Sequence, residues 1–317
     1  MSKLVSILTP TYNNEKQIER LLLSILKQTY KNIEFIIIND GSTDNTLNII
    51  RDYQKIFNNE GIELIILSQE NKGQAAAINK GLKIFSGDYF CWVDADDWLD
   101  QDSIKKKVSF LEKNESYGFV RSDGYITKKP NLENNKLDKF SNHINLTSSE
   151  LFYDLLYVRN IYFTGAGYMA RRNCILNAIP NLHINESREG QNWQILLPLS
   201  IEYRCGYINE PLFYYYDRPD SHSHSVNEMN KEIIRCDNHK KLVTDILTSI
   251  KNVPINNWDL LLDDIYNRKK LGVYYFYGDI QNIKIYFNKI RNKKIKDYIK
   301  YFYFILKWVK SWKKSDF

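Results

Sequence analysis

Three aspartates lie within four positions: Asp94, Asp96 and Asp97 of the segment VDADDW, directly after a strongly apolar stretch. Crowded carboxylates are costly in a protein unless positive charge meets them. Mg²⁺ and Mn²⁺ take oxygen ligands and typically join one or two carboxylates to the phosphates of a substrate. If the strand persists, Asp94 and Asp96 share one side and Asp97 caps the following turn. An isolated motif of this kind is better interpreted as a solvated acidic turn before the helix predicted over 101–113, so its surroundings must decide.

The surroundings alternate two patterns over the first hundred residues. Short apolar runs rich in β-branched residues are typical of strands buried on both faces, and the stretches between them have helical spacing. This order predicts an α/β fold with a doubly wound, mostly parallel sheet. The predicted strands cover 4–9, 33–38, 62–67 and 89–93, and the predicted helices cover Glu15–Lys27, Thr43–Phe57 and Gln74–Phe85.

Each predicted strand ends in polar residues. In doubly wound sheets ligands bind outside the carboxyl ends of the strands, so these residues should meet at one edge. Asp40 alone could be turn chemistry, with Ser42 capping the next helix. The coincidence of four polar strand ends favours a binding site. The four ends are 9–13, 39–42, 68–74 and 94–97.

Several other classes of protein fit the sequence poorly. It has no GxxxxGK[ST] loop, and the dinucleotide-like match GAGYMA at 165–170 lies outside the opening βαβ unit. The four cysteines form no CxxC pair, and the start has neither a signal-peptide pattern nor an apolar run long enough to span a bilayer. We therefore expect a cytoplasmic protein, peripheral to the inner face of the cell membrane.

Three segments together resemble family 2 glycosyltransferases of the GT-A fold. They are VSILTPTYNNEKQIERLLLSILKQTYKNIEFIIINDGSTDNT, ENKGQAAAINKGL and DYFCWVDADDW. The resemblance is strong over about the first 100 residues and continues weakly to about residue 226. It implies a hexosyl- or N-acetylhexosaminyltransferase that uses a nucleotide-sugar donor, usually UDP-linked, and inverts the anomeric carbon.

The resemblance also implies roles for individual residues. Asp96 would hold Mn²⁺ or Mg²⁺ on the diphosphate, Asp40 would bind the base, and Asp94 would face the ribose. The residues implied to bind the nucleotide are Thr9, Pro10, Thr11, Tyr12, Asp40, Asn71, Lys72, Gly73, Asp94 and Ala95.

The catalytic base is less clear, because the chain departs from the family here. Relatives often carry a Glu-Asp pair where this sequence has Gln191 and Asn192, and amides cannot accept a proton at neutral pH. We predict Glu189 as the base, with Glu186 as the alternative. If neither serves, the chain binds nucleotide sugars without turning them over.

A loop at 214–225, YYYDRPDSHSHS, contains Arg218, His222 and His224. Because a similar loop closes over the donor in relatives, His224 is a candidate to complete the metal's ligands. The alternative is an ordinary surface loop whose histidines bind nothing.

The chain is predicted to divide into a nucleotide-sugar-binding catalytic domain, 1–225, and a basic helical extension, 226–317. Between Arg291 and Lys314 there are nine Lys or Arg residues and one acid. The apolar positions there have helical spacing, which predicts an interfacial helix on an anionic membrane. The alternative is a helix packed on the catalytic domain with a solvated basic face; nucleic acid is not expected. The apolar positions are Ile295, Tyr298, Ile299, Phe302, Ile305, Leu306, Val309 and Trp312.

These predictions combine into an inverting transferase that adds sugar to a glycan or polyisoprenyl-linked acceptor in surface polysaccharide synthesis. The alternatives are a non-catalytic nucleotide-sugar-binding protein and a metal-dependent phosphotransferase. The second alternative would place its aspartates after the first strand, whereas here they follow the fourth.

Overall fold

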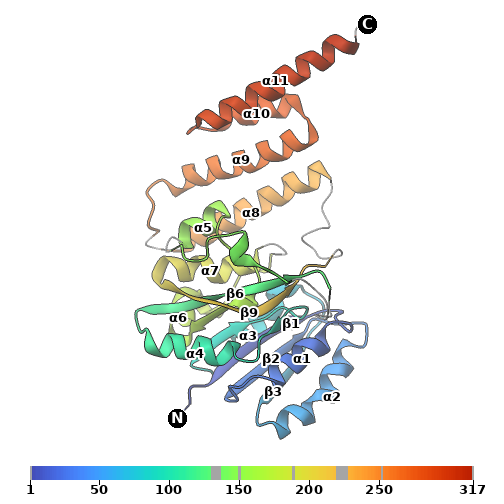
Figure 1. Cartoon of the computed structure of the whole chain (residues 1–317), viewed down its shortest axis with the longest axis vertical. Helices are drawn as coiled ribbons and strands as arrows, with labels where there is room; N and C mark the ends of the chain where they lie inside the picture. The colour runs from blue at the N-terminus through green and yellow to red at the C-terminus, as the bar shows by residue number, and fades with distance from the viewer. Residues whose placement is uncertain are drawn as a thin grey trace. The chain divides into compact units, whose positions relative to one another are not determined.

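The computed structural model describes residues 2–129, 137–148, 151–187, 190–218, 228–250 and 253–315, with side chains described as far as residue 306. The chain separates into two compact units, Met1–Pro219 and Asp220–Phe317. Each unit has its own core of buried side chains. Figure 1 shows the helices and strands of the chain.

The first unit begins with four parallel strands: β1 (Val5–Thr11), β2 (Ile33–Asn39), β3 (Glu63–Ser68) and β4 (Tyr89–Trp92). Their order in the sheet is β3-β2-β1-β4. β1, β2 and β4 are buried along their whole length, as their continuous apolar runs predict. β3 is partly exposed, because it forms the edge of the sheet.

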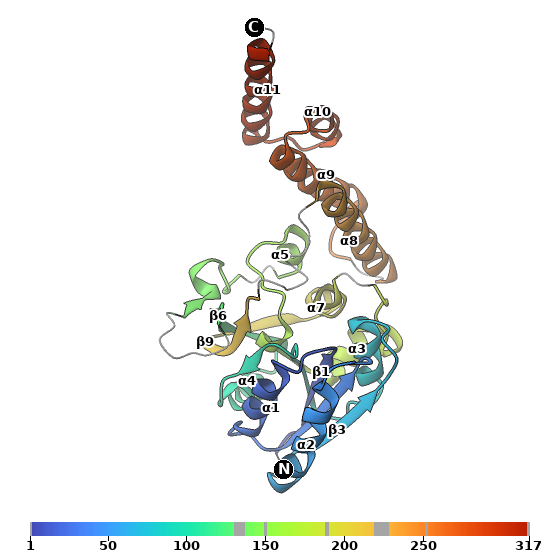
Figure 2. The same cartoon turned by 90° about the vertical axis from the view of Figure 1, so that its right-hand side faces the viewer.

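Three helices connect these strands: α1 (Ile18–Leu26), α2 (Thr46–Asn59) and α3 (Gln74–Leu82). Since parallel crossovers are right-handed, α1 and α2 lie on one face of the sheet. The connection through α3 runs back across β1 to β4 and covers the other face (Figure 2). The helical spacing read from the sequence of α1 is confirmed, since it buries Ile18, Leu21, Leu22 and Ile25.

The sheet continues beyond β4 in the order β8-β6-β9-β5, and β7 pairs with β6. Here β4–β8, β8–β6 and β9–β5 are antiparallel, whereas β6–β9 is parallel. The predicted doubly wound α/β fold is therefore confirmed, with a parallel first half and a mixed second half. The strands are β5 (Trp98–Leu99), β6 (Tyr117–Thr127), β7 (Asp138–Lys139), β8 (Tyr168–Arg171) and β9 (Arg204–Tyr216).

The segment GAGYMA forms a short 3₁₀ turn leading into β8. A Cβ on Gly165 would lie 2.1 Å from the Trp92 ring, so this glycine lets the backbone pack directly on β4. The segment thus runs into an antiparallel strand and does not open a helix. The remaining helical segments of the unit are α4 (Ser103–Lys113), η1 (Phe140–Asn142), α5 (Leu151–Tyr157), η2 (Gly165–Gly167), α6 (Arg172–Ala178), η3 (Pro180–Leu182) and α7 (Gln191–Glu202).

The second unit is helical in its described residues. It comprises α8 (Met229–Ser249), α9 (Trp258–Tyr277), α10 (Ile280–Lys289) and α11 (Ile295–Ser315). One core cluster of this unit is formed by apolar and tyrosine side chains of α9, α10 and the residue after α10, with rings from α11 packed against them. The residues of this cluster are Leu271, Tyr274, Tyr275, Ile283, Phe287 and Ile290.

Candidate active site

The ends of the parallel strands meet at one edge, where the strand order reverses between β1 and β4. The Thr9 hydroxyl donates to the Val93 carbonyl oxygen over 2.9 Å, and the Asp40 amide donates to the Thr11 carbonyl oxygen, also over 2.9 Å. This is the switch point at which doubly wound sheets bind their ligands. Thr9, Pro10 and Thr11 are buried in β1. Tyr12, directly after the strand, is 44% exposed.

Asp40 holds the loop that leads into α3. Its Oδ1 accepts hydrogen bonds from Gln69 Nε2 at 2.8 Å and from the Lys72 amide at 2.9 Å, and its Oδ2 accepts from the Gly73 amide at 2.8 Å. A carboxylate has about four acceptor sites, and these three bonds occupy most of them. The structure therefore brings Asp40 and Asn71–Gly73 together, as the resemblance implies. The contact with a nucleotide base stays a prediction.

Gly41 makes the approach of these two loops possible. Its φ of +74° is in the left-handed region, and a Cβ there would lie 2.8 Å from the Asn71 nitrogen. Any larger residue would push the loops apart.

The three aspartates after β4 lie in three different environments. The Asp97 amide donates to the Asp94 carbonyl oxygen at 3.1 Å, so the chain turns here and the strand does not persist. Asp94 accepts from Gln74 Nε2 at 2.8 Å, and Asp96 is paired with Arg218 at 3.1 Å.

The predicted role of Asp97 is wrong, because its side chain does not cap the following turn. Its carboxylate is buried, accepting hydrogen bonds from the Thr164 hydroxyl and from the Tyr216 amide. Asp102 occupies the N-terminal position of α4. Asp97 therefore ties the turn to the last residue of β9.

Burial and mutual repulsion shift the pKa values of these carboxyls. Burial and the neighbouring charge of Asp96 raise the pKa of Asp94 to about 7, against an opposing hydrogen bond from Gln74. Burial, followed by the charges of Asp96 and Asp94, raises the pKa of Asp97 well above its usual value. The cluster is thus short of positive charge where the three side chains meet.

Two arginines supply part of that charge, and sequence reasoning missed this role for both. Arg20 Nη2 donates to the Asp96 carbonyl oxygen at 2.8 Å, and its guanidinium lies 4.1 Å from the centre of the Trp98 ring. Arg218, from the end of β9, pairs with the Asp96 carboxylate. Neither contact has a local sequence signal, because α1 and β9 are far from the turn along the chain.

The donor atoms around Asp96 suit a hard divalent cation. They are carboxylate oxygens. Burial and, after it, the charge of Asp96 raise the pKa of Asp94, and a cation would offset that negative charge. Asp96 would be its ligand, beside Asp94. Within the described residues no three His, Cys, Asp or Glu side chains are arranged to hold a metal. His224 and His222 lie outside the described residues.

Asn192 joins β4 to the loop before η2. Its Oδ1 accepts from Trp92 Nε1 at 2.7 Å, and its Nδ2 donates to the Phe163 carbonyl oxygen. The next residue, Trp193, stacks on Phe163 with ring centres 3.7 Å apart. An amide can donate and accept at once, whereas a carboxylate can only accept. Asn192 therefore has a positioning role that an ionised acid at this place could not fill.

Asn192→Asp should lower the free energy of unfolding by about 1–3 kcal/mol at pH 7, because the new carboxylate would face the Phe163 carbonyl without a proton to donate. It should not raise the rate of sugar transfer. The loss should shrink as the pH falls towards 4, where the acid is protonated and can donate. Urea unfolding at several pH values measures both effects.

Gln191→Glu is the matched control, since the Gln191 amide donates only a 3.3 Å hydrogen bond to the Ser187 carbonyl oxygen. Its stability should change by less than about 1 kcal/mol. An Asn192→Asp protein as stable as the original, with faster transfer, would contradict the positioning role.

The candidate bases remain predictions. Glu186 is exposed, and Glu189 lies outside the described residues. Gly190, which precedes α7, has a φ of +68°. Ala95 is buried in the turn between Asp94 and Asp96.

Comparisons with known proteins agree with this geometry. The model of the family "Glycosyl transferase family 2" matches residues 6–173, more than half of the 317-residue chain. TuaG of Bacillus subtilis strain 168, a glycosyltransferase named for teichuronic acid biosynthesis, is 37% identical over 138 residues, which cover 43% of this chain and 52% of TuaG. The chain spans about half or less of the length of the curated relatives that it matches.

Two solved structures share the fold. TarS 1–349 of S. aureus in complex with UDP-GlcNAc has a TM-score of 0.63 at 17% identity and covers 97% of this chain and 92% of that one. The mannosyltransferase PcManGT of Pyrobaculum calidifontis, in complex with GDP-Man and Mn²⁺, has a TM-score of 0.57 at 17% identity and covers 90% of this chain and 79% of that one. At this identity the likeness concerns the fold.

The predicted resemblance is thereby confirmed. The switch-point site, the order of its strands and the family match all agree, and the chain belongs to glycosyl transferase family 2 with the GT-A fold.

Proposed function

We propose that this protein transfers a sugar from a nucleotide-sugar donor to an acceptor hydroxyl, with inversion at the anomeric carbon. The observation that carries the proposal is the switch-point site on a family 2 fold. There the loop held by Asp40 and the turn containing Asp96 lie at one sheet edge. The same family match disfavours the phosphotransferase alternative.

The donor is proposed to be UDP-linked. TarS binds UDP-GlcNAc, which supports a uridine donor, while PcManGT binds GDP-Man and makes guanosine the alternative to test. The nucleoside would lie along Thr9–Tyr12 and Asp40, with the diphosphate towards Asp96.

Transfer requires that negative charge on the leaving diphosphate be stabilised and that the acceptor hydroxyl lose a proton. Arg218 already lies at the Asp96 carboxylate and can neutralise charge there. A divalent cation bound by Asp96 would act as a Lewis acid towards the diphosphate. A carboxylate near the start of α7 would accept the proton, and displacement from the opposite face inverts the anomeric carbon.

A panel of UDP- and GDP-sugars, each with Mg²⁺, Mn²⁺ or EDTA, tests the function. We expect release of UDP from one UDP-sugar, dependent on the metal. Tight binding of a nucleotide sugar without release in the presence of any tested acceptor would favour the non-catalytic alternative. Release from a GDP-sugar alone would correct the donor.

The second unit supports a further part of the proposal, attachment to an anionic membrane surface. In the described part of the chain, every helix is too short or too polar to cross a bilayer. In α11, however, two isoleucines, a phenylalanine and a leucine are between 57% and 80% exposed. They are spaced 4, 3 and 4 residues apart and so form one stripe. This exposed stripe consists of Ile295, Ile299, Phe302 and Leu306.

Not all of the predicted apolar face is available for a membrane. Tyr298 and Tyr301 contact Phe287 of α10, at ring-centre distances of 5.3 and 4.0 Å, and Phe304 contacts Tyr275 at 4.5 Å. One part of the helix therefore packs on the core of its own unit, and the exposed stripe is what remains.

Lysines beside the exposed stripe favour an anionic bilayer as its partner. Lys296 and Lys300 neighbour the stripe on the helix, and the sequence continues with Lys307 and Lys310 at the same helical positions. Each basic side chain near an anionic surface adds roughly 1 kcal/mol of attraction. A membrane-bound enzyme would reach a polyisoprenyl-linked acceptor for surface polysaccharide, which agrees with the role for which TuaG is named.

Replacing two residues of the exposed stripe, Ile299→Ser with Phe302→Ser, should weaken binding to anionic vesicles at least about tenfold, because each inserted apolar side chain contributes roughly 1.5–3 kcal/mol. Donor hydrolysis in solution should persist. Sedimentation with vesicles of 70% phosphatidylcholine and 30% phosphatidylglycerol measures the binding. Truncation at about residue 290 should act in the same direction, although it also removes the rings that pack on α10.

The matched control is Ile234→Ser with Phe276→Ser. It changes the same residue types at exposed positions of α8 and α9, outside the exposed stripe. If both double variants bind vesicles as well as the original protein does, the interfacial role of α11 is wrong.

A further inference from the structure

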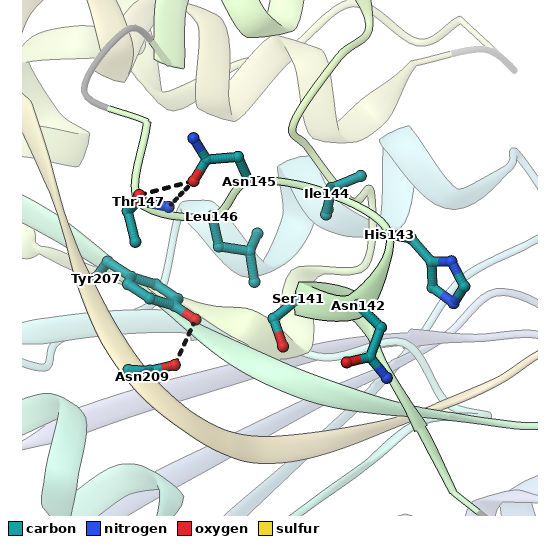
Figure 3. Close-up of a pocket in the computed structure, with 9 residues that line it drawn as sticks. All are labelled: Ser141, Asn142, His143, Ile144, Asn145, Leu146, Thr147, Tyr207 and Asn209. Carbon is teal, nitrogen blue, oxygen red and sulfur yellow. Dashed lines mark hydrogen bonds between the residues drawn. The ribbon is translucent and has the colours of Figure 1, made fainter.

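A cavity of about 550 Å³ in the first unit is lined by none of the switch-point residues. Its walls are residues 141–147, the segment between β7 and α5, together with Tyr207 and Asn209 of β9 (Figure 3). Its volume is typical of a site for a small ligand. The proposed transfer chemistry uses none of these residues.

Two buried charges hold the wall formed by residues 141–147. Arg121, 1% exposed on β6, donates to the Leu146 carbonyl oxygen at 2.7 Å and to the Asn160 carbonyl oxygen at 3.0 Å. Asp123, 2% exposed on the same strand, accepts from the Ser141 hydroxyl at 2.6 Å and from its amide at 3.2 Å. Burying charged groups is costly unless hydrogen bonds compensate. These bonds anchor the wall to β6 at both Ser141 and Leu146.

The lining is neutral and rich in hydrogen-bonding groups. Its described residues include no Lys, Arg, Asp or Glu, and the ring of His143 is bonded to Asp138 outside the cavity. A phosphate or carboxylate ligand would need a cation here. Apolar side chains, among them Ile144 and Leu146, line the cavity beside the polar groups, which suits a ligand with both apolar and hydrogen-bonding faces. Asparagine amides and hydroxyls, which donate and accept at once, match a ligand with many hydroxyl groups.

Tyr207 and Asn209 form the best-defined part of the lining. The Tyr207 hydroxyl donates to Asn209 Oδ1 at 3.1 Å, as Figure 3 shows. This bond orients the amide of Asn209, and with it the NH₂ group. Burial raises the pKa of Tyr207, and the charge of Asp123 adds to the shift, so the hydroxyl stays protonated at neutral pH. The pair presents an aromatic face, a hydroxyl oxygen and an amide donor side by side.

We propose that this cavity is a subsite for a neutral sugar unit of the acceptor glycan, away from the reacting end. Tyr216, whose amide is bonded to Asp97, is nine positions after Tyr207 on β9, so the subsite lies at most about 30 Å along the strand from the aspartate turn. A glycan several units long would bridge the two. The assignment of this sugar to the acceptor rests on the proposed function, whereas the binding of a sugar is inferred from the cavity alone.

The test is ligand-observed saturation-transfer NMR on the full chain with maltotriose, cellotriose and triacetylchitotriose. We expect at least one trisaccharide to bind with a Kd of about 1 mM or below, a modest affinity for a neutral sugar. Tyr207→Ala and Asn209→Ala should each raise that Kd at least fivefold. Tyr207→Phe, which keeps the ring, should have a smaller effect. Circular dichroism checks that each variant is folded.

Asn58→Ala, an exposed asparagine on α2, is the matched control and should bind like the original protein. Excess UDP should not displace the sugar. The proposal is overturned if none of the three sugars binds, if UDP displaces the one that binds, or if folded Tyr207→Ala and Asn209→Ala variants both bind it unchanged. UDP release by the original protein is measured separately, so sugar binding without release would count against the transferase and not against the subsite.

Discussion

Asp96→Asn should reduce sugar transfer by roughly 100- to 1,000-fold while the fold is retained, the size of effect expected when a group that stabilises transition-state charge is lost. The asparagine keeps the shape of the side chain but removes the charge that would hold a divalent cation against the diphosphate. The Asp96 side chain is partly exposed, and its pairing with Arg218 is at the surface of the site, so the fold should not depend on it. Steady-state release of nucleoside diphosphate, together with thermal melting, measures both quantities.

Asp52→Asn provides the control, because Asp52 is exposed on α2, outside the switch-point site. It should retain the original rate. An Asp96→Asn enzyme with full activity that EDTA does not inhibit would remove the metal role from Asp96.

Glu189→Gln should abolish sugar transfer and leave the affinity for the nucleotide sugar nearly unchanged. The base contacts the acceptor hydroxyl, and its loss typically costs about 100- to 10,000-fold in rate. The hydrogen bonds of Asn192 strengthen this prediction, since its amide is occupied between Trp92 and Phe163 and has no basic group to offer. Isothermal titration with the donor and a transfer assay separate binding from chemistry.

Glu186→Gln is the companion variant, because Glu186 is the alternative base and is exposed. It should keep most of the transfer activity. If Glu186→Gln is inactive and Glu189→Gln is not, the role moves to Glu186. If both variants transfer sugar like the original protein, neither glutamate is the base.

Much of the fold followed from local pattern. The four parallel strands were predicted because buried strands need continuous apolar residues, and such runs are visible without knowledge of their neighbours. The meeting of their polar ends followed as well, since parallel strands deliver their carboxyl ends to one edge. Asp40 and the Asn71–Gly73 loop lie together at this edge, although the hydrogen bonds between them were not predicted.

The sequence by itself therefore determined the family, the doubly wound sheet and the edge at which the site forms. Only the tertiary structure decided which groups meet the aspartates. Arg20 reaches Asp96 from α1, and Arg218 reaches it from the end of β9. Asp97 is buried against Thr164, whereas the sequence predicted a capping role for it. It also divided the apolar face of α11 between a packed part and an exposed stripe. The physical reason is the same in each case: local periodicity encodes strands and helices, whereas the partner of a buried charge or ring depends on segments that only packing brings together.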